Sequence, residues 1–335
     1  MSIDKKLPIF VAGHNGMLGS AIQKKLRLLG FTNIIVKSKK QLDLTNQRDV
    51  NRFFQKNKIS YVFLCAGKVG GIYANNNYPA DFIKSNLLIQ TNLIDASLNF
   101  NVKRFLFLGS SCIYPKFSIQ PIKADNWLTG NLEDSNRAMA TAKIAGIEMC
   151  WSYNRQFKKR NTTKYLAVMP TNLYGPNDHY DILDSHVLPA LIRKFHTAKE
   201  NNLSQVSVWG SGKVFREFLF SEDAADACIY FMFLGEKKLM NFLKSSDKKK
   251  LPPIINIGTG KDIQIKQLAN KIKKLTNFNG KILFDTSKLD GTPKKLLDCS
   301  VSKSLGWSAK TSLEEGLKKT YKDFTNNIHK YINSD

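Results

Sequence analysis

Short apolar runs alternate with amphipathic segments through the first half of the chain. Apolar side chains fill nearly every position of the runs at 7–11, 34–36, 61–66, 104–109 and 165–169, which predicts buried strands. Apolar spacing typical of helices lies between them, at about 20–29, 47–57, 81–100 and around Lys143. Apolar strands separated by helices indicate a parallel sheet covered on both faces. The pattern therefore predicts an α/β protein with a Rossmann-type, doubly wound parallel sheet.

The second half of the chain is less regular. Helices are predicted at about 187–198 and 265–275, with a strand at 206–209, among loops that contain Pro and Gly. We expect residues 1–175 to form a Rossmann domain. Residues 176–335 are expected to form mainly a smaller substrate-binding lobe, with some segments returning to the main sheet. The lysine-rich stretch 237–250 is interpreted as a solvated loop or insertion.

Three glycines lie between the first predicted strand and the first predicted helix. Gly13, Gly16 and Gly19 have the spacing G-x-x-G-x-x-G, and Met17 lies inside the turn. Such glycines allow a tight turn and a close approach of the backbone to a pyrophosphate, which the amides of the following helix can bind. Glycines can also simply end a strand, but this position in the first βα unit favours dinucleotide binding.

The end of the second predicted strand distinguishes between the two nicotinamide dinucleotides. An NAD enzyme usually has an acidic residue there, whereas this chain has Lys37-Ser38-Lys39-Lys40. Cations suit the 2′-phosphate of NADP, so Lys37 and Lys39 predict NADPH as the cofactor. The alternative is that these lysines only decorate a surface turn.

Charge and composition narrow the choice of partners. The chain has 335 residues and a formal net charge of +24, which suits anionic ligands. The lysines are spread along the chain and accompany no nucleic-acid-binding motif, so we expect no nucleic acid partner. The five cysteines include no C-x-x-C pair, which predicts a cytoplasmic protein with no metal site. No apolar run is long enough to cross a membrane.

Candidate catalytic groups follow the fourth predicted strand and lie on the next helix. Ser110 and Cys112 lie in Leu108-Gly109-Ser110-Ser111-Cys112-Ile113-Tyr114-Pro115 and should emerge at the carboxyl edge of the sheet. Met139 and Lys143 are four residues apart, so they share one face of a helix. Further distinctive segments are 68–76, 169–176, 185–191, 208–212, 216–218 and 290–298. With these segments the chain resembles the GDP-L-fucose synthase family of extended short-chain dehydrogenase/reductases from about residue 7 to 325.

The resemblance implies two acid/base groups and a reductase site. Cys112 and His186 would move protons at C3 and C5 of a 4-keto sugar, because a thiol and an imidazole are both plausible acid/base groups near neutrality. Ser110 would bind the carbonyl oxygen, and Lys143, with His186, would hold the cofactor. Met139 stands where the family has a proton-donating tyrosine, and a thioether has no proton to give. The implied residues for the GDP moiety are Val187, Leu191, Lys194, Trp209, Arg216 and Lys295.

Alternative interpretations of these residues stay open at this point. Cys112 could be an inert buried thiol, His186 a capping residue, Trp209 core packing, and Arg216 the partner of Glu217 in an ion pair. The resemblance implies an NADPH-dependent 3,5-epimerase/4-reductase that converts GDP-4-keto-6-deoxymannose to GDP-L-fucose and forms a homodimer. Because of Met139, an epimerase-only or altered-specificity enzyme, or a catalytically silent homologue, stays possible.

Overall fold

The computed structural model describes residues 3–158, 163–182 and 184–332. A six-stranded sheet in the order β2-β1-β3-β4-β5-β9 runs through the larger lobe, and its neighbouring strands are all parallel. The predicted Rossmann-type sheet is therefore confirmed. The strands are β1 (Ile9–Ala12), β2 (Ile34–Ile35), β3 (Tyr61–Leu64), β4 (Arg104–Leu108), β5 (Lys164–Pro170) and β9 (Ile254–Ile257).

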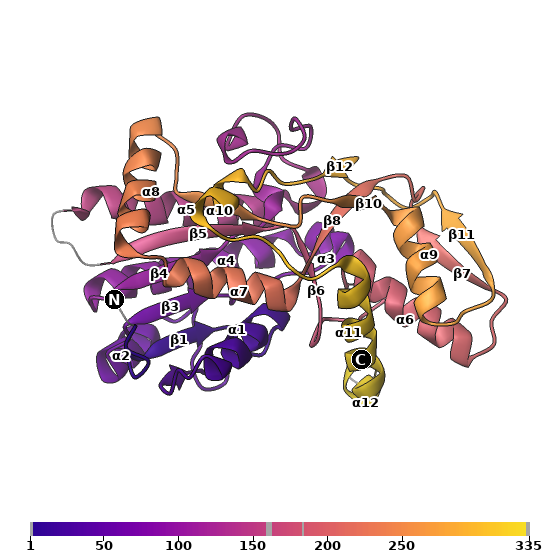
Figure 1. The fold of residues 1–335 in the computed structure, drawn as a ribbon, viewed down its shortest axis with the longest axis horizontal. Coiled ribbons are helices and arrows are strands. Elements are labelled where there is room, and N and C mark those ends of the chain that lie inside the picture. The colour runs from indigo at the N-terminus through magenta and orange to yellow at the C-terminus, as the bar shows by residue number, and fades with distance from the viewer. Residues whose placement is uncertain (1–2, 159–162, 183, 333–335) are drawn as a thin grey trace.

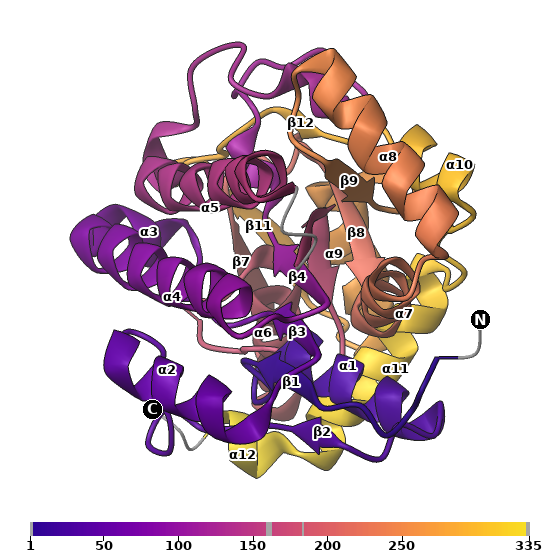
Figure 2. The same ribbon diagram turned by 90° about the vertical axis from the view of Figure 1, so that its left-hand side faces the viewer.

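Consecutive side chains of each strand point to opposite faces of the sheet, and each face has its own core. Phe10 and Phe105 pack on one face with apolar residues of three helices, whereas Ile9 and Leu106 pack on the other. Helices α4 and α5 lie side by side on the first face, and α1 and α7 cover the second (Figure 2). The helices are α1 (Met17–Leu28), α2 (Gln47–Asn57), α4 (Pro79–Asn99), α5 (Arg137–Gln156) and α7 (Ser221–Met232).

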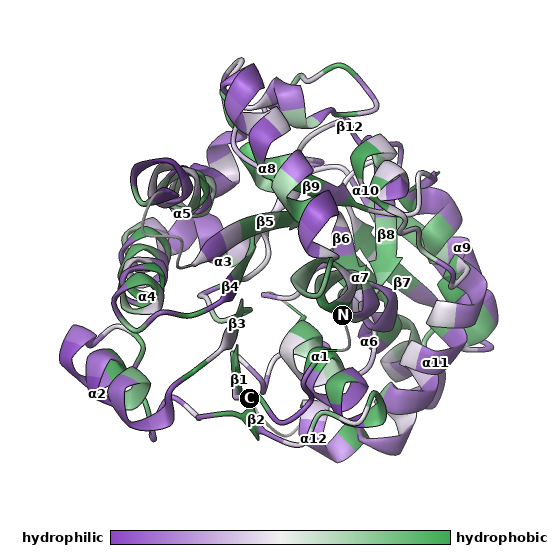
Figure 3. Ribbon diagram, turned by 60° about the vertical axis from the view of Figure 1, so that its left-hand side comes forward, coloured by the Kyte–Doolittle hydropathy of each residue, from purple (hydrophilic) through white to green (hydrophobic). Residues whose placement is uncertain are grey.

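Burial on both faces explains why the strands are apolar throughout. Figure 3 shows hydrophobic strands at the centre of the molecule and hydrophilic stretches on α2 and on the outer sides of other helices. Since helices cover both faces of the sheet, no strand position has to be polar, and the strict alternation of a half-buried strand is lost.

A smaller lobe lies beside the carboxyl edge of the sheet (Figure 1). Its apolar core contains Leu188, Phe195, Leu268 and Phe324, contributed by three different helices. Its elements are β6 (Asn172–Tyr174), α6 (Val187–Glu200), β7 (Gln205–Trp209), β8 (Phe215–Phe220), β10 (Asp262–Gln264), α9 (Ile265–Leu275), β11 (Lys281–Asp285), β12 (Lys294–Lys295), α11 (Leu313–Asn326) and α12 (Ile328–Ile332).

Several segments of the second half pack on the larger lobe. Strand β9 pairs with β5 at one edge of the large sheet, α7 covers one of its faces, and α10 (Ser300–Leu305) packs beside β9. The interpretation of 237–250 as a solvated loop is wrong, because α8 spans Glu236–Lys249. The reason is that Leu239 and Leu243 lie one turn apart on the same face and are buried, while the lysines occupy the rest of the helix surface.

The strand order places a switch point beside β1. The chain leaves β1 for β2 on one side and then returns through α2 to β3 on the other side. Ligands of doubly wound sheets bind at the carboxyl ends of strands beside such a point. The glycine turn follows β1 at this place, and short α3 (Ile72–Asn77) follows β3.

Candidate active site

The glycine turn has the geometry of a dinucleotide cradle. Gly13 has φ +88°, and a Cβ there would lie 2.6 Å from the backbone nitrogen of Ala66. A Cβ on Gly19 would overlap the carbonyl group of Gly13, whereas at Gly16 it would meet only the carbonyl oxygen of Gly13, at 3.5 Å. Gly16 is the N-cap of α1, which begins at Met17, and none of the described side chains caps this helix. The residues present therefore fit a pyrophosphate at the helix N-terminus.

The lysines after β2 are open to solvent. Lys37, Lys39 and Lys40 are exposed, and none forms an ion pair with another residue of the described ranges. Ser38 between them is held by Gln41, whose Oε1 accepts from the Ser38 amide at 3.0 Å. This arrangement offers cations at the end of β2, as a 2′-phosphate requires.

Lys143 lies at the end of β4, behind the cavity wall. Its Nζ donates to the carbonyl oxygen of Leu108 at 2.9 Å and lies 5.0 Å from the ring centroid of Phe107. Burial lowers the pKa of Lys143 to about 8, and the Cys112 and Cys65 sulfurs act in the opposite direction. A Cβ on Gly67, which follows β3, would lie 3.8 Å from the same Nζ. Lys143 thus lies between the ends of β3 and β4, close to the glycine turn.

Asn86 on α4 fixes the loop after β3. Its Oδ1 accepts from the amide of Lys68 at 3.0 Å, and its Nδ2 donates to the carbonyl oxygen of Lys68 at 2.9 Å. The amide of Gly71, further along this loop, donates to the carbonyl oxygen of Asp184 at 2.7 Å. The loop therefore connects the large sheet to the segment that carries His186.

Ser110 and Cys112 form a hydrogen-bonded pair after β4. Ser110 Oγ accepts from the Cys112 amide at 3.4 Å and from Cys112 Sγ at 3.1 Å. Met139, near the start of α5, packs with Cys112, Ala74 and Phe82 and is only 8% exposed. An apolar side chain at position 139 thus shares a buried cluster with the candidate acid/base thiol.

His186 is the N-cap of α6 and belongs to the smaller lobe. Although His186 is exposed, desolvation by the surrounding protein lowers the pKa of His186, and Asp184 acts in the opposite direction. Lys295 and His179 lower the pKa further. All of these effects apart from Asp184 favour the neutral imidazole, which can accept a proton at pH 7.

A cavity of about 270 Å³ between the two lobes brings most of the predicted residues together. Ser110, Cys112 and Met139 line it from the larger lobe, and His186 lines it from the smaller one. The six residues predicted for the GDP moiety also line it: Val187, Leu191, Lys194, Trp209, Arg216 and Lys295. The glycine turn, Lys37, Lys39 and Lys143 are not among its lining residues.

Trp209 lies in the cavity wall between two lysines. Its side chain is 39% exposed, and its ring centroid is 4.8 Å from Lys194 Nζ and 5.6 Å from Lys288 Nζ. A core tryptophan would be covered by apolar neighbours, so the exposed ring and its cations favour a ligand-facing role. Burial lowers the pKa of Lys194.

Arg216 and Glu217 do not pair with each other, because successive residues of β8 face opposite sides. Arg216 donates to the carbonyl oxygens of Phe215 and Asp290, at 2.8 and 3.1 Å. Glu217 is fully buried and accepts from the amides of Gly260 and Leu297 at 2.7 and 3.0 Å. The ion-pair alternative for Arg216 is therefore wrong, and its charge is available to the cavity.

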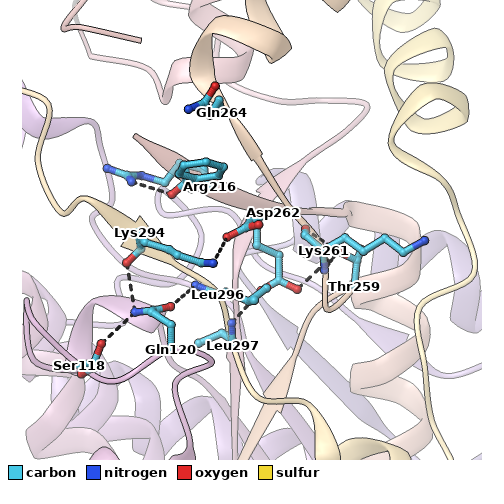
Figure 4. A network of polar contacts seen from close by, with 12 residues as sticks. Ser118, Gln120, Arg216, Thr259, Lys261, Asp262, Gln264, Lys294, Leu296 and Leu297 are labelled. Carbon is cyan, nitrogen blue, oxygen red and sulfur yellow. Dashed lines mark hydrogen bonds and ion pairs between the residues drawn. The ribbon is translucent and has the colours of Figure 1, made fainter. Parts of the chain in front are cut away.

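A polar network holds β12 beside β8 (Figure 4). Lys294 pairs with Asp262 at 3.2 Å, and Gln120 Nε2 donates to the Lys294 carbonyl oxygen at 3.2 Å. Gln120 Oε1 also accepts from the amide of Leu296 at 2.8 Å. Because the residues on both sides of Lys295 are tied down, its side chain stays directed to the cavity.

Sequence reasoning missed several residues of the cavity wall. Glu133 pairs with Lys116 at 3.1 Å, and Asp290 Oδ1 accepts from the amide of Ser211 at 2.8 Å. Tyr73, Ile182 and Leu289 also line the cavity. These residues come from loops or from the short helix α3, where no apolar periodicity signals orientation. Tyr73 and Asp290 lie in the distinctive segments 68–76 and 290–298, although neither was predicted as a site residue, and only the charge of Glu133 could have suggested a role.

The structure also bears on metal binding and on membrane insertion. Within the described ranges, no group of three or more His, Cys, Asp or Glu side chains could hold a metal ion. Among the described helices, none has the length and apolar character needed to cross a bilayer.

Known proteins resemble the chain over nearly its whole length. Residues 9–242 match the model of the NAD dependent epimerase/dehydratase family. GDP-L-fucose synthase 1 of Arabidopsis thaliana is 49% identical over 325 residues, which cover 97% of this chain and 95% of that protein. A GDP-6-OMe-4-keto-L-xylo-heptose reductase from C. jejuni has a TM-score of 0.90 at 38% identity and covers 98% and 100% of the two chains. A GDP-L-fucose synthetase from Naegleria fowleri bound to NADP has a TM-score of 0.86 at 27% identity, covering 98% and 97%.

The family model covers more than half of the chain, and the Arabidopsis relative is similar over nearly all of it. The chain belongs to the NAD dependent epimerase/dehydratase family, in the branch of the GDP-L-fucose synthases.

Proposed function

We propose that this chain catalyses the NADPH-dependent 3,5-epimerisation and 4-reduction of GDP-4-keto-6-deoxy-D-mannose to GDP-L-fucose. The observation that carries the proposal is the single cavity, which is lined by Ser110, Cys112 and His186 together with the residues expected to bind GDP. The names of close relatives support the substrate, since the Arabidopsis relative is a GDP-L-fucose synthase.

Epimerisation needs two groups that exchange protons with carbon. The C4 ketone acidifies the hydrogens at C3 and C5, and inversion requires a proton to leave from one face and return on the other. Cys112 and His186 come from different lobes and line the same cavity, which supports a pair of acid/base groups. His186 has a lowered pKa and is suited to act as the base at neutral pH.

The dinucleotide region supports binding of NADPH, as in the N. fowleri relative that is bound to NADP. The glycine turn would hold the pyrophosphate, and Lys37 and Lys39 the 2′-phosphate. Lys143 and His186 would hold the nicotinamide end. When bound, NADPH would supply the hydride that reduces C4.

The GDP moiety is proposed to lie against α6 and β8. Lys194, Arg216 and Lys295 offer three cations to the diphosphate, and Trp209 offers a partly exposed ring to the base. Val187 and Leu191, on the first turns of α6, provide the apolar part of the wall.

A second candidate function has a specific observation in its favour. Met139 packs in an apolar cluster and its thioether has no proton to give, which favours an enzyme that stops after epimerisation. The resemblance to the C. jejuni heptose reductase also favours a related GDP-keto heptose as an alternative substrate.

The deciding experiment incubates the purified protein with NADPH and GDP-4-keto-6-deoxymannose in D₂O. The proposal predicts one NADPH oxidised per GDP-L-fucose formed, with deuterium at C3 and C5. Deuterium uptake without loss of NADPH would establish the epimerase-only alternative instead. If neither NADPH oxidation nor deuterium uptake is seen, and GDP-keto heptoses also fail to react, the protein is a catalytically silent homologue.

The oligomeric state and the cellular compartment of the protein are also proposed. We propose a cytoplasmic homodimer, which is supported by five free cysteines and by the partly exposed Leu88 on α4 beside α5. Light scattering coupled to size-exclusion chromatography tests the mass, and a monomer at micromolar concentration would contradict the dimer.

A further inference from the structure

The hydroxyl hydrogen of Ser110 has no acceptor in the described protein. Ser110 Oγ accepts from both the amide and the thiol of Cys112, at 3.4 and 3.1 Å. Because both contacts use the oxygen as acceptor, the Ser110 hydrogen remains free to donate elsewhere. Ser110 lines the cavity, so this hydrogen can be given to a ligand oxygen there.

The neighbouring residues do not offer a direct proton donor at the same place. Met139 has a thioether and packs against Cys112 and Ala140 in an apolar cluster. Lys143 is 6% exposed and does not line the cavity, and its Nζ donates to the carbonyl oxygen of Leu108. The hydrogen-bonded chain from Cys112 to Ser110 is therefore a route by which a proton can reach the cavity next to Met139.

Lys143 and Lys295 both interact electrostatically with the Cys112 sulfur. Burial lowers the pKa of both Lys143 and Lys295, and interaction with Cys112 is the leading opposing effect on each. Lys295 lines the cavity with Cys112 and is held from both sides along β12.

We propose that Cys112 and Ser110 form a proton relay to O4 of the keto sugar, which takes the role of the phenol that is absent at Met139. This inference rests on the proposed function and adds to it the source of the proton in the reductase step.

The relay balances in protons and electrons. Reduction of the ketone forms the C4–H bond with a hydride, so C4 is reduced, NADPH is oxidised to NADP⁺, and negative charge develops on O4. The Ser110 O–H bond breaks as the O4–H bond forms, and Ser110 Oγ takes the proton of Cys112 Sγ. Cys112 is left as a thiolate and regains its proton from water. In the reverse reaction, the oxidation of the C4 alcohol, the Cys112 thiolate accepts the O4 proton through Ser110.

The first test needs neither cofactor nor substrate. The rate of alkylation of Cys112 by iodoacetamide reports its thiolate, with Cys112→Ala as the background. Ser110→Ala and Lys295→Met are expected to lower this rate about three- to tenfold at pH 7, because the thiolate loses a hydrogen-bond donor or a cation. Ser118→Ala, the same change in the following loop, is the control and should have no effect. An unchanged rate in Ser110→Ala would overturn the proposed pair.

The second test isolates the proton at O4 from epimerisation. Oxidation of GDP-L-fucose by NADP⁺ removes the O4 proton without inverting C3 or C5. Cys112→Ala should slow this reaction by roughly 10²–10⁴-fold, the usual cost of losing a general base. In a Met139→Tyr background the same change should cost less than about tenfold, since a phenol can replace the relay. Cys112→Ser should keep part of the activity but shift its pH profile to higher pH.

The two backgrounds also separate failure of the relay from failure of the proposed function. An equal loss on Cys112→Ala in both backgrounds would overturn the relay and leave the function standing. Oxidation of GDP-L-fucose that is seen only in Met139→Tyr, and not in the wild type, would also overturn the relay and leave the function standing. No oxidation of GDP-L-fucose by either protein would reject the proposed function, and the relay with it.

Discussion

Asn177 donates its side-chain N–H to the carbonyl oxygen of Asn15 at 2.8 Å, although 162 positions separate them along the chain. Asn15 lies in the glycine turn, and Asn177 follows β6 with φ +63°. Lys330 Nζ donates to Asn177 Oδ1 at 2.5 Å, and the Asn177 amide donates to Asp323 Oδ2 at 3.0 Å. One residue thus ties the proposed pyrophosphate cradle to the two C-terminal helices.

Replacement of Asn177 by Gly should weaken dinucleotide binding. Glycine keeps the left-handed backbone and removes the side chain, which holds Asn15 and accepts from Lys330. The loss of the hydrogen bond to Asn15 predicts a dissociation constant for NADPH about three- to tenfold higher, measured by cofactor fluorescence. Asn202→Gly is the matched control, since Asn202 has φ 51° on a distant loop. Equal affinity of Asn177→Gly and the wild type would mean that the bond only stabilises the fold.

The buried Lys143 side chain should lower the free energy of unfolding at neutral pH. Burial lowers its pKa to about 8 from 10.5, so between these values the unfolded chain binds more protons than the folded one. The free energy of unfolding therefore rises with pH across this window as Lys143 loses its proton. The destabilisation by Lys143 is largest below pH 8, where its buried side chain is charged. Lys143→Met should stabilise the protein at pH 7 by about 1–3 kcal/mol, because it removes a buried charge.

Urea denaturation at pH 7 and at pH 10 measures this difference. The advantage of Lys143→Met should shrink at the higher pH, while Lys84→Met, at an exposed site on α4, should match the wild type at both. A constant difference between Lys143→Met and the wild type would contradict the lowered pKa.

Removal of the Trp209 ring should weaken binding of the nucleotide sugar and spare the cofactor. The ring lies in the cavity wall near Lys194 and Lys288, away from the glycine turn. Stacking on a base contributes about 1–3 kcal/mol, which predicts a dissociation constant for GDP roughly 5- to 150-fold higher in Trp209→Ala. Calorimetric titration with GDP and with NADPH separates the two effects. Trp151→Ala removes another indole outside the cavity, and its GDP affinity should stay at the wild-type value.

Epimerisation should depend on a neutral His186. Because desolvation by the surrounding protein lowers the pKa of His186, the imidazole stays unprotonated to a pH below the ordinary histidine range. Deuterium exchange at C3 or C5 should therefore persist below pH 6.5 and fall only when the ring is protonated. His186→Asn should reduce exchange at one of the two carbons by roughly 10²–10⁴-fold. His179→Asn is the control, and an equal loss there would remove His186 from its proposed role.

The fold was largely predictable because its local signals are strong. Apolar runs such as Phe105–Leu108 can be buried only when both faces of a sheet are covered, and the glycine turn marks the first βα unit. Helix α8 was missed because its lysines outnumber the two buried leucines, so composition concealed the helical spacing.

The sequence by itself determined the parallel sheet, the cradle at Gly13, and the residue types available for catalysis. It did so because strand burial and turn geometry depend on residues that are close along the chain. Only the tertiary structure decided that Cys112 and His186 line one cavity, that Arg216 is separated from Glu217, and that Ser110 accepts from Cys112. Such relationships depend on how segments that are distant in the sequence pack together. This packing is determined by the apolar surface that the whole chain buries, which no local pattern of residues reveals.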